Sequence, residues 1–193
     1  MLEQTRASHI LNESTEVPTG RLGIWWFLAS EVVIFGGLIC CYILLRWRNP
    51  EWGVEAQHTI NAAGALNTLV LLTSSLSMVL AHAAVVEGNL KQAARNLSFT
   101  LLGGAIFLCV KAVEYTHEIK EGFVPARSLF WSFYYIMTGL HALHVIGGMV
   151  AIFVILLAVR GGRAPQRVEY IGIYWHFVDV VWIFLFPLLY LTT

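Results

Sequence analysis

Ionisable side chains lie inside several long apolar stretches of this chain. An ionisable group in hydrocarbon costs at least about 2.5–3.5 kcal/mol on insertion scales, so a membrane-embedded chain retains one only where it is paired, hydrated or functional. Eight side chains are of this kind: Glu31, His82, Lys111, Glu114, His141, His144, His176 and Asp179. Their spacing indicates what chemistry each could do.

Glu31 has apolar residues on both sides. At 1.5 Å per helical residue it lies roughly 12 Å into the first apolar stretch. Two interpretations are open. The carboxyl could exchange protons or contact lipid, or it could be a neutral carboxyl that is hydrogen-bonded to a neighbouring helix. Both make Glu31 a candidate functional residue.

Pairs of ionisable residues recur at a spacing of three, which places both members on one face of a helix. Lys111 and Glu114 have opposite charges, and we expect an ion pair that neutralises both near the outer surface. His141 and His144 share a face in the same way.

His176 and Asp179 repeat this spacing in the last apolar stretch. A carboxylate can orient and charge an imidazole, so this pair could satisfy itself. Glu169 lies seven residues before His176, on the same face. The three side chains could form a polar ladder with its base at the inner surface.

The histidines do not match a metal site. A di-iron site in a helix bundle needs two Glu-x-x-His motifs and two further Glu residues. Within its long apolar stretches this chain has one such motif, from Glu114 to His117, and it falls at a helix end. His141 and His144 lack a carboxylate pair at their depth, and the cysteines lack metal-type spacing. We expect no metal, no cofactor and no catalytic residue in this chain.

Composition indicates which elements position these residues. The apolar fraction is 58% and the charged fraction 12%, which points to lipid as the solvent. The sequence predicts an all-α fold, an integral membrane bundle of five transmembrane helices. One domain, 23–193, follows a polar N-terminal segment, 1–22, in which we expect no cleavable signal. Five windows reach the roughly 20 apolar residues that a spanning helix needs: 23–46, 63–86, 97–117, 131–158 and 171–191.

Short charged segments connect these windows, so neighbouring helices should pack antiparallel. With the N-terminus inside, seven Lys and Arg residues fall on the inner side and four on the outer side. The excess of basic residues in inner loops favours an inside N-terminus and an outside C-terminus. The 12 basic and 12 acidic residues form no basic cluster, which argues against a nucleic-acid partner.

Small and hydroxyl residues form rows on some of the windows. Thr68, Ser75 and His82 are seven residues apart and therefore lie on one face. Such residues let membrane helices approach closely. This face either packs within the chain or docks onto a partner.

Five segments, taken in order, resemble the subunit III family of haem-copper oxidases over residues 20–190. The last two are the most specific, above all the run YWHFVDVVW in the final helix. The segments are RLGIWWFLASEVVIFGG at 21–37, LNTLVLLTSSLSM at 66–78, KAVEY at 111–115, TGLHALHVIGG at 138–148 and VEYIGIYWHFVDVVWIFLFPLLYL at 168–191.

The resemblance implies a function at the level of a complex, a proton-pumping terminal respiratory oxidase. Members of the family lie beside subunit I, which holds haem and copper and reduces oxygen to water. Electrons arrive from cytochrome c through a cytochrome c-bearing subunit II, and a small subunit IV completes the expected partners. Subunit III itself carries no redox centre. Its implied roles are to stabilise subunit I, hold phospholipid and assist proton uptake, in a multi-pass protein of the bacterial inner membrane.

The resemblance also assigns roles in the first and fourth helices. Glu31 falls on the buried, carbodiimide-reactive carboxyl of the family's S-E-V run, and Arg21 on a basic position near lipid headgroups. His144 falls on the histidine of the H-V-x-x-G motif. These positions are associated with protons or lipid, and none is catalytic.

Further matches lie in the third and fifth helices. Glu114 falls on the E-Y motif, and Glu169, His176 and Asp179 fall on the terminal motif. Lys111 departs from the pattern, because many members have Gln there. Longer members also begin with two more helices, so this chain starts at what would be their third.

Other functions stay open at this point. The same fold serves subunit III of quinol oxidases and a homologue that accompanies nitric oxide reductases. A stand-alone proton channel or transporter using Glu31, His144 and His176 belongs to a different class. The sequence lacks the broken helices and paired half-repeats that transporters show.

Overall fold

The computed structural model describes residues 19–163 and 167–191, with side chains from residue 22 onward. Five of its helices are long and apolar enough to cross a membrane, which confirms the predicted all-α bundle. The side of the membrane that each terminus faces stays a prediction. The elements are α2 (Thr19–Arg48), the short α3 (Trp52–Ala56), α4 (Asn61–Val86), α5 (Leu90–Lys120), α6 (Leu129–Arg160) and α7 (Arg167–Tyr190).

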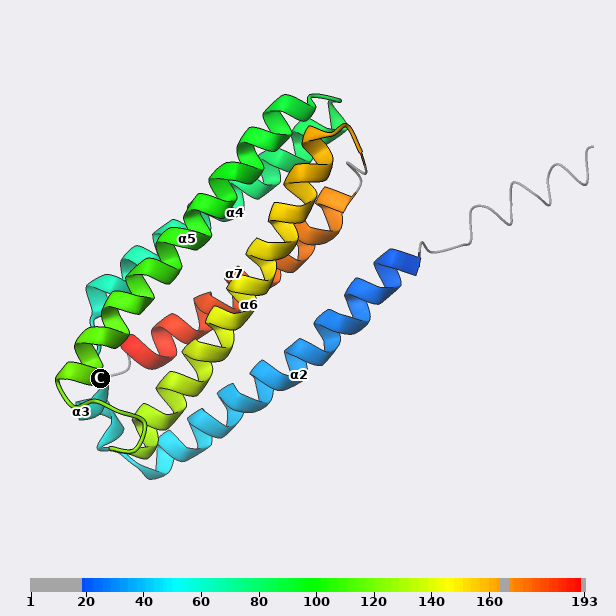
Figure 1. Cartoon of the computed structure of the whole chain (residues 1–193). Coiled ribbons are helices and arrows are strands. Elements are labelled where there is room, and N and C mark those ends of the chain that lie inside the picture. The colour runs from blue at the N-terminus through cyan, green and yellow to red at the C-terminus, as the bar shows by residue number, and fades with distance from the viewer. Residues whose placement is uncertain (1–18, 164–166, 192–193) are drawn as a thin grey trace, which may run out of the picture.

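Consecutive long helices run antiparallel, and α2 lies along one edge of the bundle (Figure 1). Helix α4 packs against α5 and α7, α6 packs against α5 and α7, and α2 contacts α6 and α7. Helix α7 therefore lies between the α2–α6 side and the α4–α5 hairpin. Half of its apolar window is buried, compared with 22% of the window in α2.

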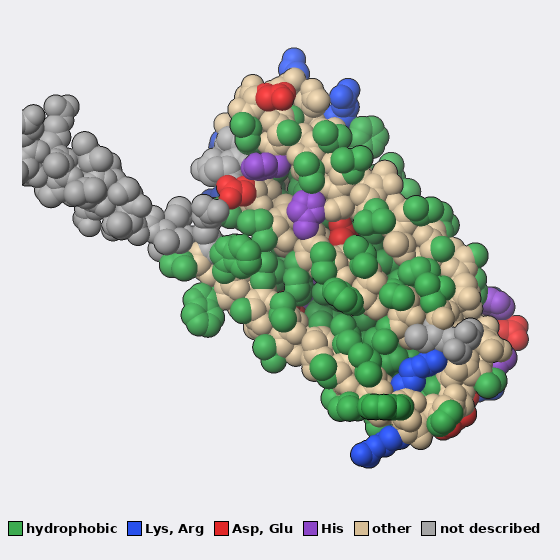
Figure 2. Space-filling view, turned by 180° about the vertical axis from the view of Figure 1, so that it is seen from behind, with side chains coloured by type: hydrophobic (Ala, Val, Ile, Leu, Met, Phe, Trp, Pro, Cys, Tyr) green, Lys and Arg blue, Asp and Glu red, His purple; other side chains and the backbone are tan. Residues whose placement is uncertain are grey.

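The outer surface of the bundle is apolar, as expected for a chain whose solvent is lipid. Large apolar side chains such as Trp26, Val33 and Leu44 are exposed on α2. Figure 2 shows apolar side chains over the long sides of the molecule, with most Lys, Arg, Asp and Glu side chains toward its two ends.

The core is built by close approach of α7 to its neighbours. Trp175 of α7 lies against glycines of α5 and α6: a Cβ on Gly104 or Gly148 would come within about 3.0 Å of its ring. These glycines therefore allow close packing between helices within the chain.

The predicted face of α4 also packs within the chain. Trp182 Nε1 of α7 donates to Thr68 Oγ1 at 3.1 Å, and Ser75 Oγ lies 2.6 Å from His176 Nδ1. His82 is exposed instead. The sequence left open whether this face packs within the chain or docks onto a partner. Thr68 and Ser75 pack within the chain.

The helices extend beyond the predicted windows, most clearly in α5, which begins at Leu90 and ends at Lys120. Its N-cap Asn89 accepts a hydrogen bond from the Gln92 backbone N–H at 3.1 Å. After its last residues, Gly122 adopts φ of +83°, the left-handed conformation that terminates a helix. A hydropathy window ends at the first charged residues, whereas the helix itself continues until a capping residue ends it.

Helix α3 was not predicted. Its Trp52 is buried, with ring centroids 5.3 Å from Tyr42 and 6.1 Å from Phe130. Its Glu55 accepts a hydrogen bond from Trp131 Nε1 at 2.6 Å. This short helix therefore closes one end of the bundle over α2 and α6.

Candidate functional site

Two predicted site residues meet between α2 and α6. Glu31 Oε2 lies 2.9 Å from His144 Nε2, although the residues are 113 positions apart in the chain. Both are largely withdrawn from the surface: the Glu31 side chain is 9% exposed and the His144 side chain 15%. The structure thus gives Glu31 a hydrogen-bond partner on a neighbouring helix, as one of the two sequence interpretations required.

The second nitrogen of His144 decides where protons can lie. His144 Nδ1 is 2.8 Å from the Leu140 carbonyl oxygen, which can only accept, so Nδ1 carries a proton. The contact between Nε2 and Glu31 then needs one further proton. Either a neutral carboxyl donates to a neutral imidazole, or an imidazolium donates to a carboxylate. The pair has zero net charge in both cases, which suits a medium of low dielectric.

Helix packing holds this pair in place. The buried residues of α2 are Leu28, Glu31, Phe35 and Tyr42, a stripe with heptad-like spacing that faces the bundle. Phe35 contacts the His144 ring edge-on at 5.2 Å, and the Tyr174 hydroxyl of α7 donates to the His144 carbonyl at 2.9 Å. Glu31 therefore stands in the seam that joins α2 to the other helices.

A groove of about 580 Å³ lies beside the pair, between α2, α6 and α7. Ile24, Gly147 and Tyr174 are among its lining residues, and Arg167 and Tyr170 also line it. Gly147 stands one turn after His144, so the groove begins next to the carboxyl–imidazole pair. Its lining is mostly apolar, with one basic side chain at the start of α7.

A second polar cluster surrounds Lys111 of α5. Lys111 Nζ lies 3.0 Å from Glu114 Oε2, which confirms the predicted ion pair. It also donates to the hydroxyls of Tyr134 at 3.0 Å and Tyr190 at 2.7 Å. Tyr134 in turn donates to Glu114 Oε1 at 2.9 Å. Every polar atom of the pair has a partner, which is the condition under which buried charges are tolerated.

The surroundings of this cluster are aromatic. Lys111 Nζ lies 4.7 Å from the centroid of the Tyr115 ring and 5.8 Å from that of Trp182, distances at which cation–π attraction operates. Lys111 is 3% exposed and Glu114 1%. The pair is therefore a buried tie between α5, α6 and α7.

Three members of this region were not predicted from the sequence: Glu118, Tyr134 and Tyr190. Glu118 is buried on α5, and neither of its carboxylate oxygens has a hydrogen-bond partner among the described residues. The predicted helix ended at 117, which put Glu118 in a loop. Its spacing of four from Glu114 was the available signal. The tyrosines could not be found by spacing, because they lie on other helices.

The residues of the terminal motif lie on α7 but do not form the predicted ladder. The His176 ring pairs with Ser75 of α4, and neither carboxylate oxygen of Asp179 has a hydrogen-bond partner in the described part of the chain. Asp179 is buried, and Glu169 is half-buried in the first turn. The spacing along α7 could not show that a hydroxyl on α4 would compete for the imidazole.

His141 and Arg21 are the last two residues singled out in the sequence. His141 is fully buried between the rings of Phe107, at 5.4 Å, and Trp182, at 5.2 Å. It therefore does not join His144 at Glu31, although both lie on α6. Arg21 lies in α2, but its side chain falls outside the described residues.

Comparison with known proteins decides the family. A family model described as cytochrome c oxidase subunit III matches residues 8–193. The chain belongs to the cytochrome c oxidase subunit III family. Its members are subunits of haem-copper oxidases, so this chain is a subunit of an oxidoreductase and a multi-pass membrane protein.

Individual relatives span nearly the whole chain. A probable cytochrome c oxidase subunit 3 from Nocardia farcinica is 35% identical over 96% of this chain and 93% of the relative. A quinol oxidase subunit 3 from Bacillus subtilis is 36% identical, over 90% and 88%. A haem-copper oxidase subunit I+III from Aeropyrum pernix is 35% identical over 89% of this chain, which covers 22% of that relative. The relatives are thus named as subunits of both cytochrome c oxidases and quinol oxidases.

Among residues 22–163 and 167–191, no three His, Cys, Asp or Glu side chains gather as they would around an ion. Haem and copper remain an expectation for the partner subunits. Among the described residues, Glu31 and His144 form a carboxyl–imidazole contact that holds one shared proton.

Proposed function

We propose that this chain is the non-redox subunit III of a terminal oxidase that takes electrons from cytochrome c, reduces oxygen to water and pumps protons across the bacterial inner membrane. In this role the chain stabilises the catalytic subunit I, holds phospholipid and assists proton uptake. The observation that carries the proposal is the Glu31–His144 pair, together with membership of the family.

The pair is suited to proton handling because its charge does not change when the proton moves within it. With Nδ1 of His144 committed to the Leu140 carbonyl, a single proton is shared between Nε2 and Glu31. Delivery of this proton to a partner would leave a net negative charge that favours rapid reprotonation. The pair can therefore act as a station that accepts a proton and passes it on.

Lipid retention is supported by the groove next to the pair. Ile24, Ala151 and Ile155 form apolar walls that fit an acyl chain, and Arg167 supplies a positive charge for a headgroup. We expect phospholipid in this groove to seal the contact between α2 and α6. Glu31, Arg21, His144 and the α7 residues Glu169, His176 and Asp179 are the proton- and lipid-associated residues of the proposal.

We expect association with subunits I, II and a small subunit IV, as the resemblance to the family implies. The exposed apolar face of α2 offers surface to a neighbouring subunit, and a relative whose printed name joins subunits I and III supports their adjacency. The excess of Lys and Arg in the loops at one end of the bundle supports an inside N-terminus.

Quinol is the second candidate electron donor, because a relative from Bacillus subtilis is a quinol oxidase subunit 3. The donor would bind elsewhere in the complex, so the residues of this chain do not distinguish the two. A stand-alone channel fits less well, since α2 and α4 to α7 are continuous helices.

The test is purification of the full chain in a mild detergent from its native membrane. We expect haem-bearing subunits to co-purify and the preparation to reduce oxygen with cytochrome c as donor. Activity with quinol alone would assign the second donor. A chain that purifies without haem-bearing partners would refute the proposal.

A further inference from the structure

Tyr134 lies at the centre of a cluster of tyrosine rings around Lys111, near the end of α5. Its ring centroid is 5.3 Å from that of Tyr135, 5.9 Å from that of Tyr190 and 6.2 Å from that of Tyr115. The rings of Tyr115 and Tyr135 are also in contact, with centroids 4.9 Å apart. Tyrosine is among the side chains that lose one electron most easily, and electrons move readily between rings at these distances.

Two of these tyrosines reach the surface. Tyr115 and Tyr135 are half-buried, whereas Tyr134 and Tyr190 are fully buried. The Tyr135 hydroxyl donates to the Phe123 carbonyl, at 2.8 Å, in the segment that follows α5. Tyrosines near the ends of spanning helices are typical of the membrane–water interface. An oxidant that reaches this interface therefore meets the half-buried rings first.

Tyr134 has a base in place for its phenolic proton, which a tyrosine must release when it loses an electron. Its hydroxyl donates to Glu114 Oε1 at 2.9 Å. Lys111 Nζ donates to the same hydroxyl at 3.0 Å, and the Tyr190 hydroxyl lies 3.1 Å away. Both would remain as donors to the oxygen of a Tyr134 radical. A neutral radical is therefore favoured here over Tyr135, whose hydroxyl faces a backbone carbonyl, a much weaker base.

Glu118 can supply a proton to the outer ring. It is buried beside the hydroxyls of Tyr134 and Tyr135, and neither of its oxygens has a hydrogen-bond partner among the described residues. A buried carboxylate without a partner is costly, so Glu118 holds a proton. One turn of α5 thus separates a proton acceptor, Glu114, from a proton donor.

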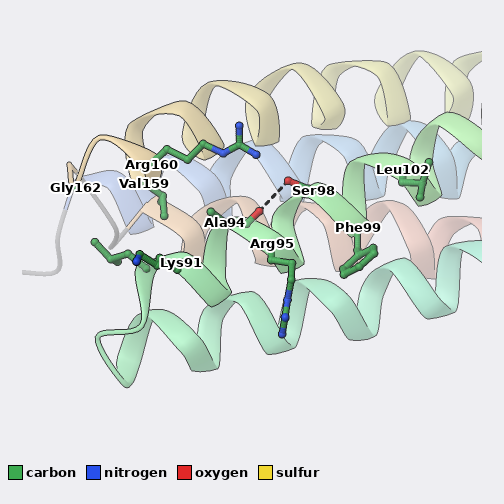
Figure 3. A pocket seen from close by; sticks show the side chains of 10 residues that line it. Lys91, Ala94, Arg95, Ser98, Phe99, Leu102, Val159, Arg160 and Gly162 are labelled. Atoms are coloured by element: carbon green, nitrogen blue, oxygen red, sulfur yellow. Dashed lines mark hydrogen bonds between the residues drawn. The ribbon is translucent and has the colours of Figure 1, made fainter.

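Packing alone does not account for these hydroxyls and carboxyls. Phenylalanine would fill the same space without polar groups that must be satisfied in the membrane. The other end of α5 shows the contrast (Figure 3): a groove there is lined by side chains such as Arg95, Ser98 and Phe99, and none of its lining residues is a tyrosine or a tryptophan. On α5 and α6 the oxidisable rings are gathered at one end.

We infer that this tyrosine cluster traps lipid peroxyl radicals. A peroxyl radical takes the hydrogen atom of the Tyr135 hydroxyl, which gives a lipid hydroperoxide and a tyrosyl radical. Tyr134 then passes an electron to that ring and its proton to Glu114, while Glu118 returns a proton to Tyr135. The radical is left on Tyr134, and the net charge of the cluster is unchanged. These steps are reversible, so a second peroxyl radical can combine with the radical at Tyr135 and end the chain reaction.

This activity is separate from electron transfer to oxygen and from the proton role proposed above. The cluster joins α5, α6 and α7, whereas Glu31 and His144 meet between α2 and α6. Failure of either proposal therefore leaves the other standing.

The test uses the full chain, with the subunits that co-purify, in vesicles of polyunsaturated phosphatidylcholine. A lipid-soluble azo initiator in air generates peroxyl radicals, and samples frozen during the reaction are read by electron paramagnetic resonance. We expect a tyrosyl signal whose lines narrow when the protein contains ring-deuterated tyrosine. Mass spectrometry should find oxidised adducts on the peptide that carries Tyr135.

Tyr134→Phe should lose most of the tyrosyl signal, while the complex stays assembled and consumes oxygen. The matched control is Tyr170→Phe, which removes a half-buried tyrosine roughly 30 Å along α7 from Tyr190 at 1.5 Å per residue. This control should keep the full signal. Lys111→Gln should keep the radical but shift its g tensor toward that of a phenoxyl oxygen without a charged donor, a change that a packing role would not produce.

A further variant leaves Tyr134 and its hydrogen bonds in place. Tyr115→Phe with Tyr135→Phe removes both half-buried phenols, so peroxyl radicals can no longer reach the buried ring. The tyrosyl signal should again be lost. This variant keeps the test decisive if Tyr134→Phe fails to fold.

Four outcomes would overturn the inference. The first is the absence of a tyrosyl signal in the wild-type complex during lipid peroxidation. The second is an equal signal in folded Tyr134→Phe, and the third is an equal loss in Tyr170→Phe, because the radical would then not belong to this cluster. The fourth is a full signal in the Tyr115→Phe, Tyr135→Phe variant, which would exclude entry through the outer rings.

Discussion

His144 Nε2 lies 2.9 Å from Glu31 Oε2 and links α6 to α2. Because His144 Nδ1 is held by the Leu140 carbonyl, the link contains one proton that either residue can carry. This bond gives α2, the most peripheral of the long helices, a polar tie to the bundle. Two consequences of the tie can be measured separately, one for protons and one for assembly.

Glu31→Gln should leave the complex assembled. The Gln amide can donate to the unprotonated His144 Nε2, so the tie between the helices is retained while the exchangeable carboxyl proton is lost. Oxygen reduction should remain largely intact, whereas proton uptake should slow or activity should decline over many turnovers. Proton uptake with a pH dye, together with prolonged oxygen consumption, checks this. Wild-type behaviour in both would remove the special role of Glu31.

His144→Ala should weaken the α2 contact. It leaves the Glu31 carboxyl without its partner, at a cost of about 1–3 kcal/mol for an unsatisfied buried polar group. We expect less phospholipid to co-purify, or the subunit to dissociate more readily in detergent. His82→Ala, which changes an exposed histidine on α4, is the matched control. Equal phospholipid content and equal dissociation in the two variants would contradict the prediction.

The sequence was sufficient for the helices and for one local contact. Five apolar windows predicted the five long helices because lipid requires long apolar segments, and a spacing of three predicted the Lys111–Glu114 pair within α5. The ends of the helices were less accurate, since capping by residues such as Asn89 is independent of hydropathy.

The contacts between helices could not be predicted from the sequence. Glu31 and His144 were each identified, but nothing in their spacing shows that α2 and α6 bring them together. The bond that His176 and Asp179 could form is not made: His176 Nδ1 pairs with Ser75 of α4, and Asp179 has no hydrogen-bond partner among the described residues. Periodicity shows which face a residue occupies, whereas its partner depends on which helix lies opposite.

Lys111→Met should destabilise the chain strongly. It leaves Glu114 as a buried charge without compensation, which typically costs about 3–5 kcal/mol. Lys111→Gln should cost less, since its amide can still donate to Glu114, and the double change Lys111→Met with Glu114→Gln should recover part of the loss. Thermal unfolding of the detergent-solubilised protein measures the order of the variants, with exposed Lys120→Gln as control. If Lys111→Met unfolds at the same temperature as the Lys120→Gln control, the Lys111–Glu114 pair does not stabilise the fold.

Two adjacent glycines of α6 allow a matched test of the core. A Cβ on Gly148 would lie 3.0 Å from the Trp175 ring, whereas one on Gly147 would have only the Tyr174 hydroxyl nearby, at 3.8 Å. Both changes to Ala gain about the same helix propensity, up to about 1 kcal/mol. The difference between them therefore isolates the contact of α6 with α7.

Gly147→Ala should leave thermal unfolding unchanged or raise its midpoint slightly. Gly148→Ala should unfold at a lower temperature than Gly147→Ala, and Gly148→Val should lose about 1–3 kcal/mol because an added side chain overpacks the core. Trp175 also contacts Ser74 through its indole N–H, at 3.1 Å, so the ring cannot move away without breaking that bond. Equal unfolding temperatures for Gly147→Ala and Gly148→Ala would show that α6 and α7 are not packed as closely as the Gly148–Trp175 contact requires.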